Sequence, residues 1–178
     1  FVPDADENGA PYATFKFRVS DGTAFSAADT TMTVNVTAVA DAPAATPNTV
    51  TTVEDTAFVF TAGHFNFSDA DAGDALTAVR ITVLATNGEL RLNGVAVSAN
   101  DVIAVADINA GKLTFVPDLD ENGTPYATFR FRVSDGTAFS AADTVMTVNV
   151  TAVQAAPTAS TNTVTPPADS AFTFTAAH

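Results

Sequence analysis

The sequence predicts an all-β protein built from antiparallel, two-sheet β-sandwich domains of about seven strands. The first observation behind this prediction is the composition: 16 Asp stand against 4 Glu, and Asp favours turns whereas Glu favours helices. The second is a period of two in the apolar residues, and the third is the recurrence of turn signals about every 8–12 residues. With 47% apolar residues, the 178-residue chain can also form a substantial core.

Each predicted strand is a short run in which apolar and polar side chains alternate. In chain order, the runs surround Phe58 and Phe60, then cover residues 79–83, 90–97, 112–116, 128–133 and 145–150. Residues 90–97 predict a hairpin, because Asn93-Gly94 supplies the positive φ angles of a type I′ turn. Residues 100–110 come closest to a helical pattern and predict at most a single turn.

An internal repeat with a period of 114 residues organises the chain. The stretch from Phe1 returns at Phe115, and 49 of the 64 aligned pairs are identical. A period of this length suits a whole domain rather than a solenoid rung. Dividing at the Ala/Pro-rich stretches predicts the C-terminal part of one unit at 1–40, a complete unit at 41–154 and the N-terminal part of a third at 155–178. The chain therefore reads as a segment of a longer tandem array.

The charge balance and the lack of cysteine exclude several classes of protein. Twenty acidic residues against seven Lys and Arg leave a formal net charge of -13, which disfavours nucleic acid and anionic membrane surfaces as partners. No apolar run approaches the roughly 20 residues of a membrane span. The absence of cysteine excludes disulfides and thiolate metal sites.

Acidic residues gather in the predicted loops, at the two poles of a sandwich. The groups are Asp118, Asp120 and Glu121; Asp69, Asp71 and Asp74; Glu54 and Asp55; Asp41; and Asp135. Neighbouring carboxylates repel one another unless a cation neutralises them, and Ca²⁺ takes 6–8 hard oxygen ligands. These loops predict calcium sites. The alternative is that Asp and Gly are common turn residues and that acid keeps an exported protein soluble.

The order of these features resembles the cadherin-like, or VCBS-type, tandem repeats of large bacterial surface adhesins and secreted proteins. The residues that carry the resemblance are Val53-Glu54-Asp55-Thr56, Asp69-Ala70-Asp71, the run FRFRVSDG at 129–136, and 148–153 leading into an Ala-Pro linker. The resemblance spans the chain. It implies tandem Ig-like domains, an extracellular or cell-surface location, and calcium at the joints between domains.

Applied to this chain, the resemblance assigns carboxylates to two joints. The first would use Asp6 and Glu7, then Asp41 of the linker, with Asp69, Asp71 and Asp135 from the complete unit. The second would use Glu54, Asp120 and Glu121, but its linker has Ala155 in place of Asp41, and Ala168 replaces Glu54 in the third unit. We therefore expect a better-ligated first joint. Calcium bound within one domain is the alternative grouping.

The sequence predicts no active site. His64 is expected to be structural, and no nucleophile elbow surrounds Ser140, so a serine triad is not indicated. Asp118 and Asp120 could serve as an acid/base pair, but a glycosidase needs sugar-stacking aromatics, and the chain has no Trp and only Tyr12 and Tyr126. The expected function is a non-enzymatic extender module of an exported bacterial adhesin, biofilm matrix or surface-filament protein.

Two other functions stay open from the sequence. The expected partners of an extender module are the neighbouring repeats of the same chain. A second hypothesis is that identical chains pair through their strand edges in a fibre or surface layer. The rival from another class is a carbohydrate- or protein-binding β-sandwich module, against which the lack of Trp argues.

Overall fold

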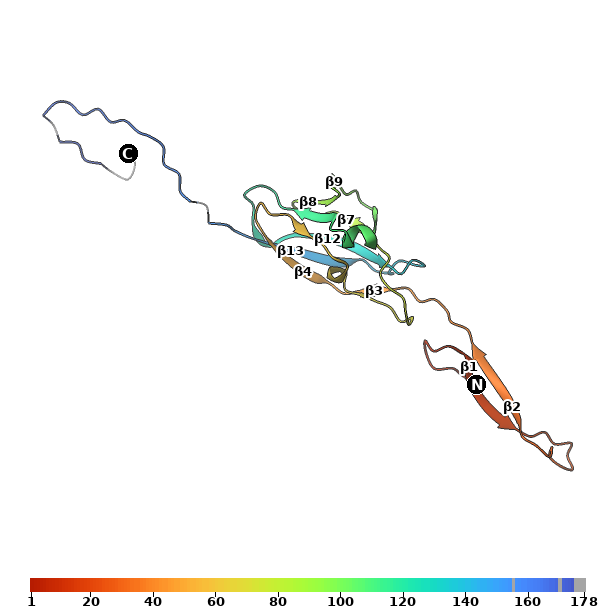
Figure 1. Cartoon of the computed structure of the whole chain (residues 1–178). Helices are drawn as coiled ribbons and strands as arrows, with labels where there is room; N and C mark the ends of the chain where they lie inside the picture. The colour runs from red at the N-terminus through yellow and green to blue at the C-terminus, as the bar shows by residue number, and fades with distance from the viewer. Residues whose placement is uncertain (155, 170, 175–178) are drawn as a thin grey trace.

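A computed structural model describes residues 1–154, 156–169 and 171–174. Figure 1 shows three parts that follow one another along the chain: an N-terminal hairpin, a β-sandwich, and an extended C-terminal segment that leaves the sandwich at the end opposite to the hairpin. The proposed beginning of the third unit at residue 155 and the second copy of His64 at residue 178 lie outside the described residues. Among the described residues, no helix has the length and apolar character to cross a membrane.

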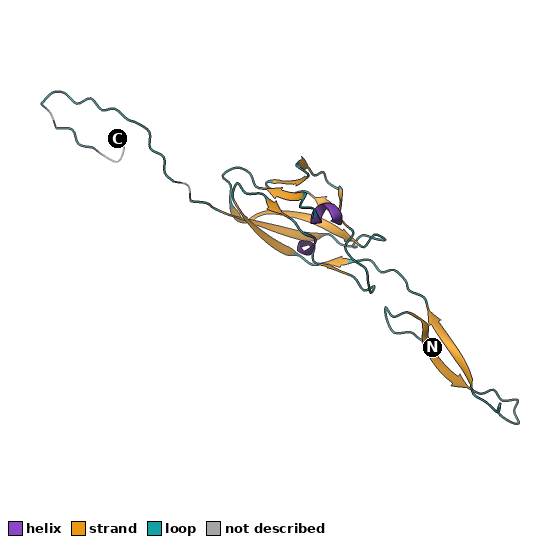
Figure 2. Ribbon diagram, viewed as in Figure 1, coloured by secondary structure: helices purple, strands orange, loops and turns teal. Residues whose placement is uncertain are grey.

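Two sheets form the sandwich (Figure 2). The larger sheet has the strand order β10 (Val102–Ala104), β7 (Ala78–Val83), β12 (Gly123–Ser134), β13 (Thr144–Thr151) and β4 (Asn48–Val53). The smaller has the order β5 (Phe58–Val59), β11 (Leu113–Val116), β8 (Glu89–Leu92) and β9 (Val95–Ala96). A separate short pair joins β3 (Ala44–Ala45) to β6 (Phe67–Ser68).

The predicted all-β sandwich is confirmed. Over residues 44–151, all of which the structure describes, seven strands have three or more residues and four have two. The predicted hairpin forms as β8 and β9 around Asn93 and Gly94, whose φ angles of 52° and 80° are both positive. The predicted single helical turn is α1 (Val105–Asn109).

Two features differ from the sequence prediction. Strand β4 pairs with β13 in parallel, so the larger sheet is not wholly antiparallel. The sequence could not reveal this pairing, because period-two alternation shows which side chains share a face of a strand but not the direction in which the strand runs. Strand β4 lies at the edge of the sheet and precedes the β12–β13 hairpin in the chain. The one-turn 3₁₀ helix η1 (Ala62–Phe65) was not predicted. Its last residue, Phe65, is fully buried in the core.

Aromatic side chains fill the space between the sheets. Phe60 and Phe129 meet edge to face with ring centroids 5.7 Å apart, and Phe65 meets Phe131 in the same way at 5.0 Å. These four rings are fully buried or nearly so. Because edge-to-face packing adds to the gain from burial, this cluster holds the larger sheet against η1 and the segment after β5.

The N-terminal hairpin consists of β1 (Gly9–Phe17) and β2 (Thr30–Val36). Its strands pair in the same register as β12 and β13: Phe15 lies opposite Met32 as Phe129 lies opposite Met146, and both hairpins have a register shift at the same position. The described part of residues 155–178 contains no strand, although residues 44–53 form β3 and β4 in the complete unit.

Candidate metal centre

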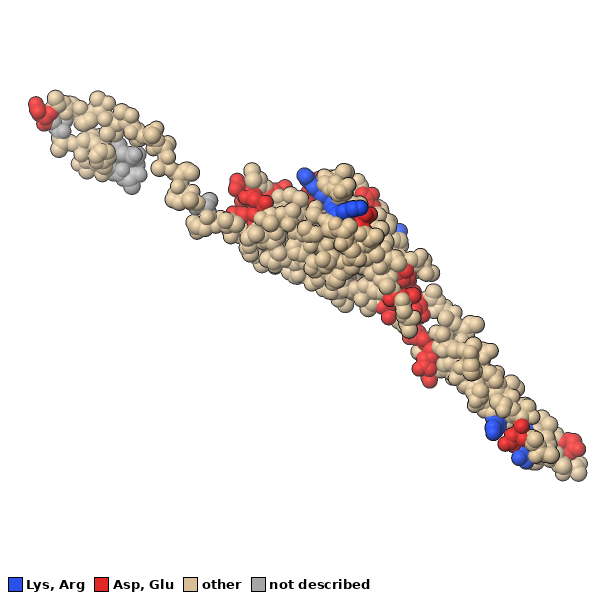
Figure 3. All heavy atoms as spheres, in the orientation of Figure 1, with Lys and Arg blue, Asp and Glu red and all other residues tan. Residues whose placement is uncertain are grey.

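The acidic residues concentrate at the two ends of the sandwich. Figure 3 shows acidic atoms where the hairpin meets the domain and again near the start of the C-terminal segment. At the hairpin end, Asp69 directly follows β6 and Asp135 directly follows β12, so the two strands deliver these carboxylates to one pole. A backbone hydrogen bond of 3.3 Å from the Asp74 N–H to the Asp71 carbonyl turns the chain back and brings Asp74 to the same place.

Asp69, Asp74 and Asp135 form a cluster in which one carboxylate oxygen from each residue lies within 4.8 Å of the other two. Within the described residues, it is the one group of at least three potential ligands this close together. The Oδ2 atoms of Asp69 and Asp135 are buried and have no hydrogen-bond partner. Leaving charged oxygens buried without a partner is costly, so these two atoms could accept a cation as their partner.

Backbone hydrogen bonds hold the other oxygen, Oδ1, of Asp135 and of Asp69. Asp135 Oδ1 accepts the N–H groups of Thr137 and Ala138 at 2.5 and 2.8 Å, and Asp69 Oδ1 accepts the N–H of Asp71 at 3.0 Å. These are Asx turns, in which an Asp side chain caps its own loop. They fix the carboxylates so that each Oδ2 atom remains available to a ligand.

The electrostatics of the cluster differ among its members. Partial desolvation, followed by the negative charges of Asp69, Asp71 and Asp135, raises the pKa of the Asp74 carboxyl above its ordinary value. The backbone N–H groups of Ala138 and Thr137 instead lower the pKa of Asp135. The Asp135 carboxylate is therefore the more readily ionised of the two, whereas Asp74 is repelled by its neighbours and would gain most from a neutralising cation.

The linker to the hairpin touches this pole. The Asp41 N–H donates to Asp71 Oδ2 at 2.7 Å. Beside this bond lies a hollow of about 330 Å³, between the first loop of the hairpin and the sandwich, whose acidic lining consists of Asp4, Asp6, Glu7, Asp41 and Asp71. Carboxylates from both sides of the joint thus face one space.

The predicted ligands of the first joint fall into two adjacent groups. Asp69 and Asp135, both partly buried, belong to the cluster with the exposed Asp74, while Asp6, Glu7, Asp41 and Asp71 line the neighbouring hollow. Asp4 was not predicted. Its signal was available, because Asp4 is the repeat equivalent of Asp118, which was predicted.

At the opposite pole, protein donors already engage the predicted ligands. Glu54 accepts from the Asn122 side chain and from the Val153 N–H, at 3.1 and 2.9 Å. Three further residues act in the same way: Asp55 binds the Asp120 N–H, and Asp118 and Glu121 both lie 3.1 Å from the Tyr126 hydroxyl. These carboxylates brace the loops before β12 against the end of β4. Calcium binding there stays a prediction.

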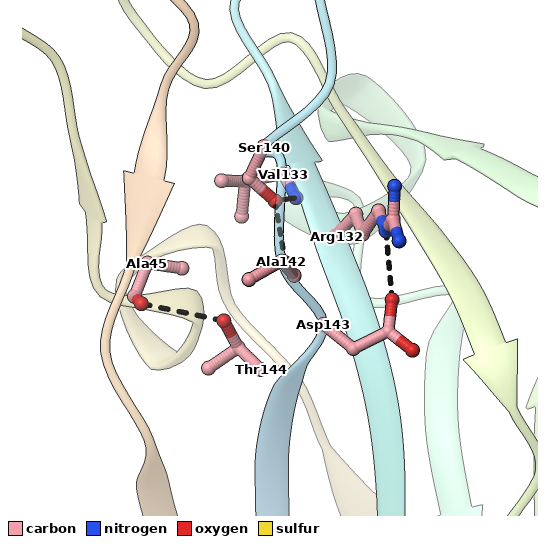
Figure 4. A network of polar contacts seen from close by, with 7 residues as sticks. All are labelled: Ala45, Arg132, Val133, Ser140, Ala142, Asp143 and Thr144. Atoms are coloured by element: carbon pink, nitrogen blue, oxygen red, sulfur yellow. Dashed lines mark hydrogen bonds and ion pairs between the residues drawn. The ribbon is translucent and has the colours of Figure 1, made fainter.

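The polar network beside β12 has a structural role (Figure 4). Ser140 is buried, its hydroxyl donates to the Ala142 carbonyl at 3.2 Å, and it lies 3.3 Å from the Val133 N–H. Thr144 donates to the Ala45 carbonyl at 3.3 Å, which ties β13 to β3. The Ser140 hydroxyl is thus held by two backbone partners.

The arrangement fits a hard divalent cation. Calcium contacts oxygens at about 2.3–2.6 Å, so one ion reaches oxygens up to about 5 Å apart, which covers the whole cluster. Three carboxylates supply negative charge, and backbone carbonyls and water complete such sites in proteins. A cation bound there would also give the two buried Oδ2 atoms of Asp69 and Asp135 the partner that they lack.

The chain was compared with curated proteins and with solved structures. No curated protein matches the sequence. Among solved structures, part of an endo-fucoidan hydrolase from glycoside hydrolase family 107 is similar, with 19% identity and a TM-score of 0.33. The similarity covers 79% of this chain but 19% of the hydrolase, so the chain spans about a fifth of that protein, and likeness at this level carries no functional argument.

The family comparison is more informative. The sequence model of the bacterial Ig domain family matches residues 40–151, which include β3 to β13 and every member of the aspartate cluster. Domains of this family are typical of exported and surface proteins of bacteria. The chain belongs to the bacterial Ig domain family.

Proposed function

We propose that the chain is a non-enzymatic extender segment of an exported bacterial surface protein, of the adhesin, biofilm-matrix or filament kind, and that calcium at the joint before the sandwich stiffens it. The finer relationship to cadherin-like, VCBS-type repeats is part of this proposal. The observation that carries it is the close cluster of Asp69, Asp74 and Asp135, in which the buried Oδ2 atoms of Asp69 and Asp135 have no hydrogen-bond partner.

The proposed mechanism is mechanical. Consecutive domains joined by a short linker move relative to one another by default. Here the contact that ties linker to domain is the Asp41–Asp71 hydrogen bond, and Asp71 shares its loop with two of the clustered aspartates. A cation on Asp69, Asp74 and Asp135 would order that loop and thereby fix Asp71 as an anchor for the linker. It would also reduce the repulsion across the acidic hollow.

Calcium is the cation that we assign, because extracellular modules bind it with dissociation constants of about 10⁻⁴–10⁻³ M through flexible sets of oxygen ligands. The second joint is expected to bind more weakly. Ala168 stands where the complete unit has Glu54, and Glu54 itself is held by Asn122 and Val153. We therefore expect calcium to stiffen mainly the joint between the hairpin and the sandwich.

Calcium titration by calorimetry, paired with small-angle X-ray scattering of the whole chain, tests the proposal. We expect binding near millimolar Kd and a narrower distribution of hairpin orientations with calcium than with chelator. Asp74→Asn is the informative variant: it removes a repelled charge, so the Tm in chelator should rise while the calcium-dependent rise in Tm is lost. Asp107→Asn, which removes an equal charge beside Lys112, should leave the calcium response intact.

Two results would overturn the proposal. If calcium raises the Tm of the Asp74→Asn variant as much as that of the wild type, the cluster is not the binding site. If calcium binds but the scattering profile stays unchanged, the ion is present without stiffening the joint, and the extender mechanism fails.

A further inference from the structure

Positive charge gathers on the larger sheet of the sandwich. Its five strands, every residue of which the structure describes, contain three arginines and no Asp or Glu, in a chain with 20 acidic residues. The arginines are Arg80 on β7 and Arg130 and Arg132 on β12. They alternate with buried apolar residues and therefore point away from the core. We call these three residues the arginine face.

Two of the guanidinium groups are held next to each other. Arg80 and Arg132 lie directly opposite on neighbouring strands, a placement that is unfavourable for like charges. Arg80 lies over the Phe139 ring, 3.8 Å from its centroid, and Arg132 forms an ion pair with Asp143 at 2.7 Å (Figure 4). These contacts fix both side chains at the surface. An anion bound beside them would offset their repulsion.

The third arginine is the most available. Arg130 is exposed and forms no ion pair within the part of the chain that the structure describes. The two remaining cations of the complete unit, Arg91 and Lys112, lie outside the larger sheet, and both form ion pairs. Three cations on the arginine face thus stand against one contacting carboxylate, that of Asp143.

Hydroxyl groups extend the same surface. Thr128, Thr147 and Thr49 lie opposite one another across β12, β13 and β4, and Thr128 shares its side of β12 with Arg130. Guanidinium groups bind carboxylates and sulfates through pairs of hydrogen bonds, and hydroxyls both donate and accept. A flat surface of this kind can bind a sugar chain that carries acidic groups. Recognition through charge does not need the sugar-stacking aromatics that the sequence lacks.

We propose that the arginine face binds a linear anionic polysaccharide through its carboxylate or sulfate ester groups. The repeat argues for a polymer. The positions equivalent to Arg130 and Arg132 in the hairpin hold Lys16 and Arg18, so the positive charge is kept even where the residue differs. Weak sites that recur from unit to unit gain avidity for a partner that is itself repetitive.

The acidic poles limit which polymers fit. Asp135, which belongs to the aspartate cluster, lies five residues from Arg130, or about 17 Å along the strand direction. This is about two Debye lengths at physiological ionic strength, so the arginine face attracts anions locally although the chain is acidic. Duplex DNA carries one charge per about 1.7 Å and would bring many phosphates toward the poles. A polysaccharide with one acidic group per sugar unit or fewer avoids much of that repulsion.

A titration of the whole, nitrogen-labelled chain followed by nuclear magnetic resonance tests the proposal. Hyaluronate serves as the carboxylate probe, dextran sulfate as the sulfate probe and dextran as the neutral one. Chelator is present throughout, which separates this site from calcium binding. We expect one or both anionic probes to shift the amide signals of β7 and β12 around the arginine face, and dextran to shift none. The probe that binds more tightly identifies the acidic group.

Variants at one position distinguish recognition from net charge. Arg130→Gln should weaken binding ~10-fold, because it removes a charged donor, and should leave the Tm unchanged because the side chain is exposed. Arg130→Lys, which introduces the residue of the hairpin copy, should weaken it only ~3-fold. Arg91→Gln removes the same charge from the smaller sheet and should change the affinity by less than ~2-fold.

Four results would overturn the proposal. One is that neither anionic probe binds, and another is that Arg91→Gln weakens binding as much as Arg130→Gln, which would show a response to net charge alone. Duplex DNA that binds as tightly as the better probe would show a surface without preference for a polysaccharide. The last is self-association of the wild type, measured by sedimentation without probe, that Arg130→Gln abolishes, since the occupant of the face would then be a second copy of the chain.

Discussion

Two copies of one hairpin, β1–β2 and β12–β13, have almost the same sequence and the same register but different surroundings. Phe129 and Met146 are 1% and 0% exposed, whereas their equivalents Phe15 and Met32 are half exposed. Phe139 packs under the Arg80 guanidinium, 3.8 Å from its ring centroid, whereas the equivalent Phe25 is 71% exposed.

The comparison separates local from global determinants. Ion pairs and Asx turns recur in both copies: Arg18–Asp29 matches Arg132–Asp143, and Asp21 caps its loop as Asp135 does. These features depend only on the hairpin sequence. Burial and the aspartate cluster occur only where β4, β7 and the β6 loop are present. Paired substitutions at equivalent positions can therefore measure what the sandwich adds to each residue.

The largest difference is expected for the core aromatic. Phe129→Ala should lower the free energy of unfolding by about 3–5 kcal/mol, because it opens a cavity where Phe129 meets Phe60. Phe15→Ala should change it by less than about 0.5 kcal/mol, as for an exposed residue. Urea unfolding followed by circular dichroism measures both. Comparable losses for the two variants would show that the hairpin packs on the domain in solution.

The next difference concerns calcium. A cation at 100 times its Kd stabilises the folded state by about 2.7 kcal/mol. Asp135→Asn should abolish this gain while its amide oxygen keeps the hydrogen bonds from Thr137 and Ala138. Asp21→Asn is the matched control, since Asp21 makes the same turn without counterparts of Asp69 and Asp74 nearby. Thermal unfolding with calcium and with chelator distinguishes them; loss of the calcium effect in both variants would argue against the cluster.

A smaller effect is expected at the tyrosine that precedes β12. Burial, together with hydrogen bonds to the Asp118 and Glu121 carboxylates, raises the pKa of Tyr126 to about 12, and the Asp118 N–H, which donates to the hydroxyl, opposes this in part. Tyr126→Phe should cost about 1.5–2 kcal/mol, and Tyr12→Phe, in the exposed copy, should leave domain unfolding unchanged.

The raised pKa of Tyr126 also sets a pH dependence. Because the folded pKa lies above the ordinary value of about 10, the contribution of this hydroxyl is complete below pH 10 and is lost as the pH rises through 12. Wild-type stability should therefore fall more steeply than that of Tyr126→Phe over this interval. Parallel curves for the two proteins would contradict the assignment.

The sequence predicted those features that depend on short stretches of chain. Period-two runs located β7, β12 and β13, and Asn93-Gly94 located the β8–β9 turn. The parallel β4–β13 pair was not predictable, because its partners lie about a hundred residues apart and alternation has no direction. The aspartates of the site were predicted, but the sequence emphasised Asp71 with Asp69. The turn from Asp71 to Asp74 places Asp74 in the cluster and leaves Asp71 to the linker.

The smallest effect is expected for the ion pair that both hairpins share. Arg132 and Asp143 lie 2.7 Å apart with side chains 36% and 25% exposed, and the Arg132 guanidinium lowers the pKa of Asp143. Lowering the pH through that depressed pKa protonates Asp143 and should remove the contribution of the ion pair to the free energy of unfolding. A double-mutant cycle with Arg132→Met and Asp143→Asn should give a coupling of about 0.2–1 kcal/mol, and the more exposed Arg18–Asp29 pair should contribute nothing to domain unfolding. The two ion pairs share sequence and geometry. A measurable coupling at Arg18–Asp29 would therefore mean that the hairpin unfolds together with the sandwich. The two hairpin copies would then differ in the exposure of their side chains but not in the cooperativity of their unfolding.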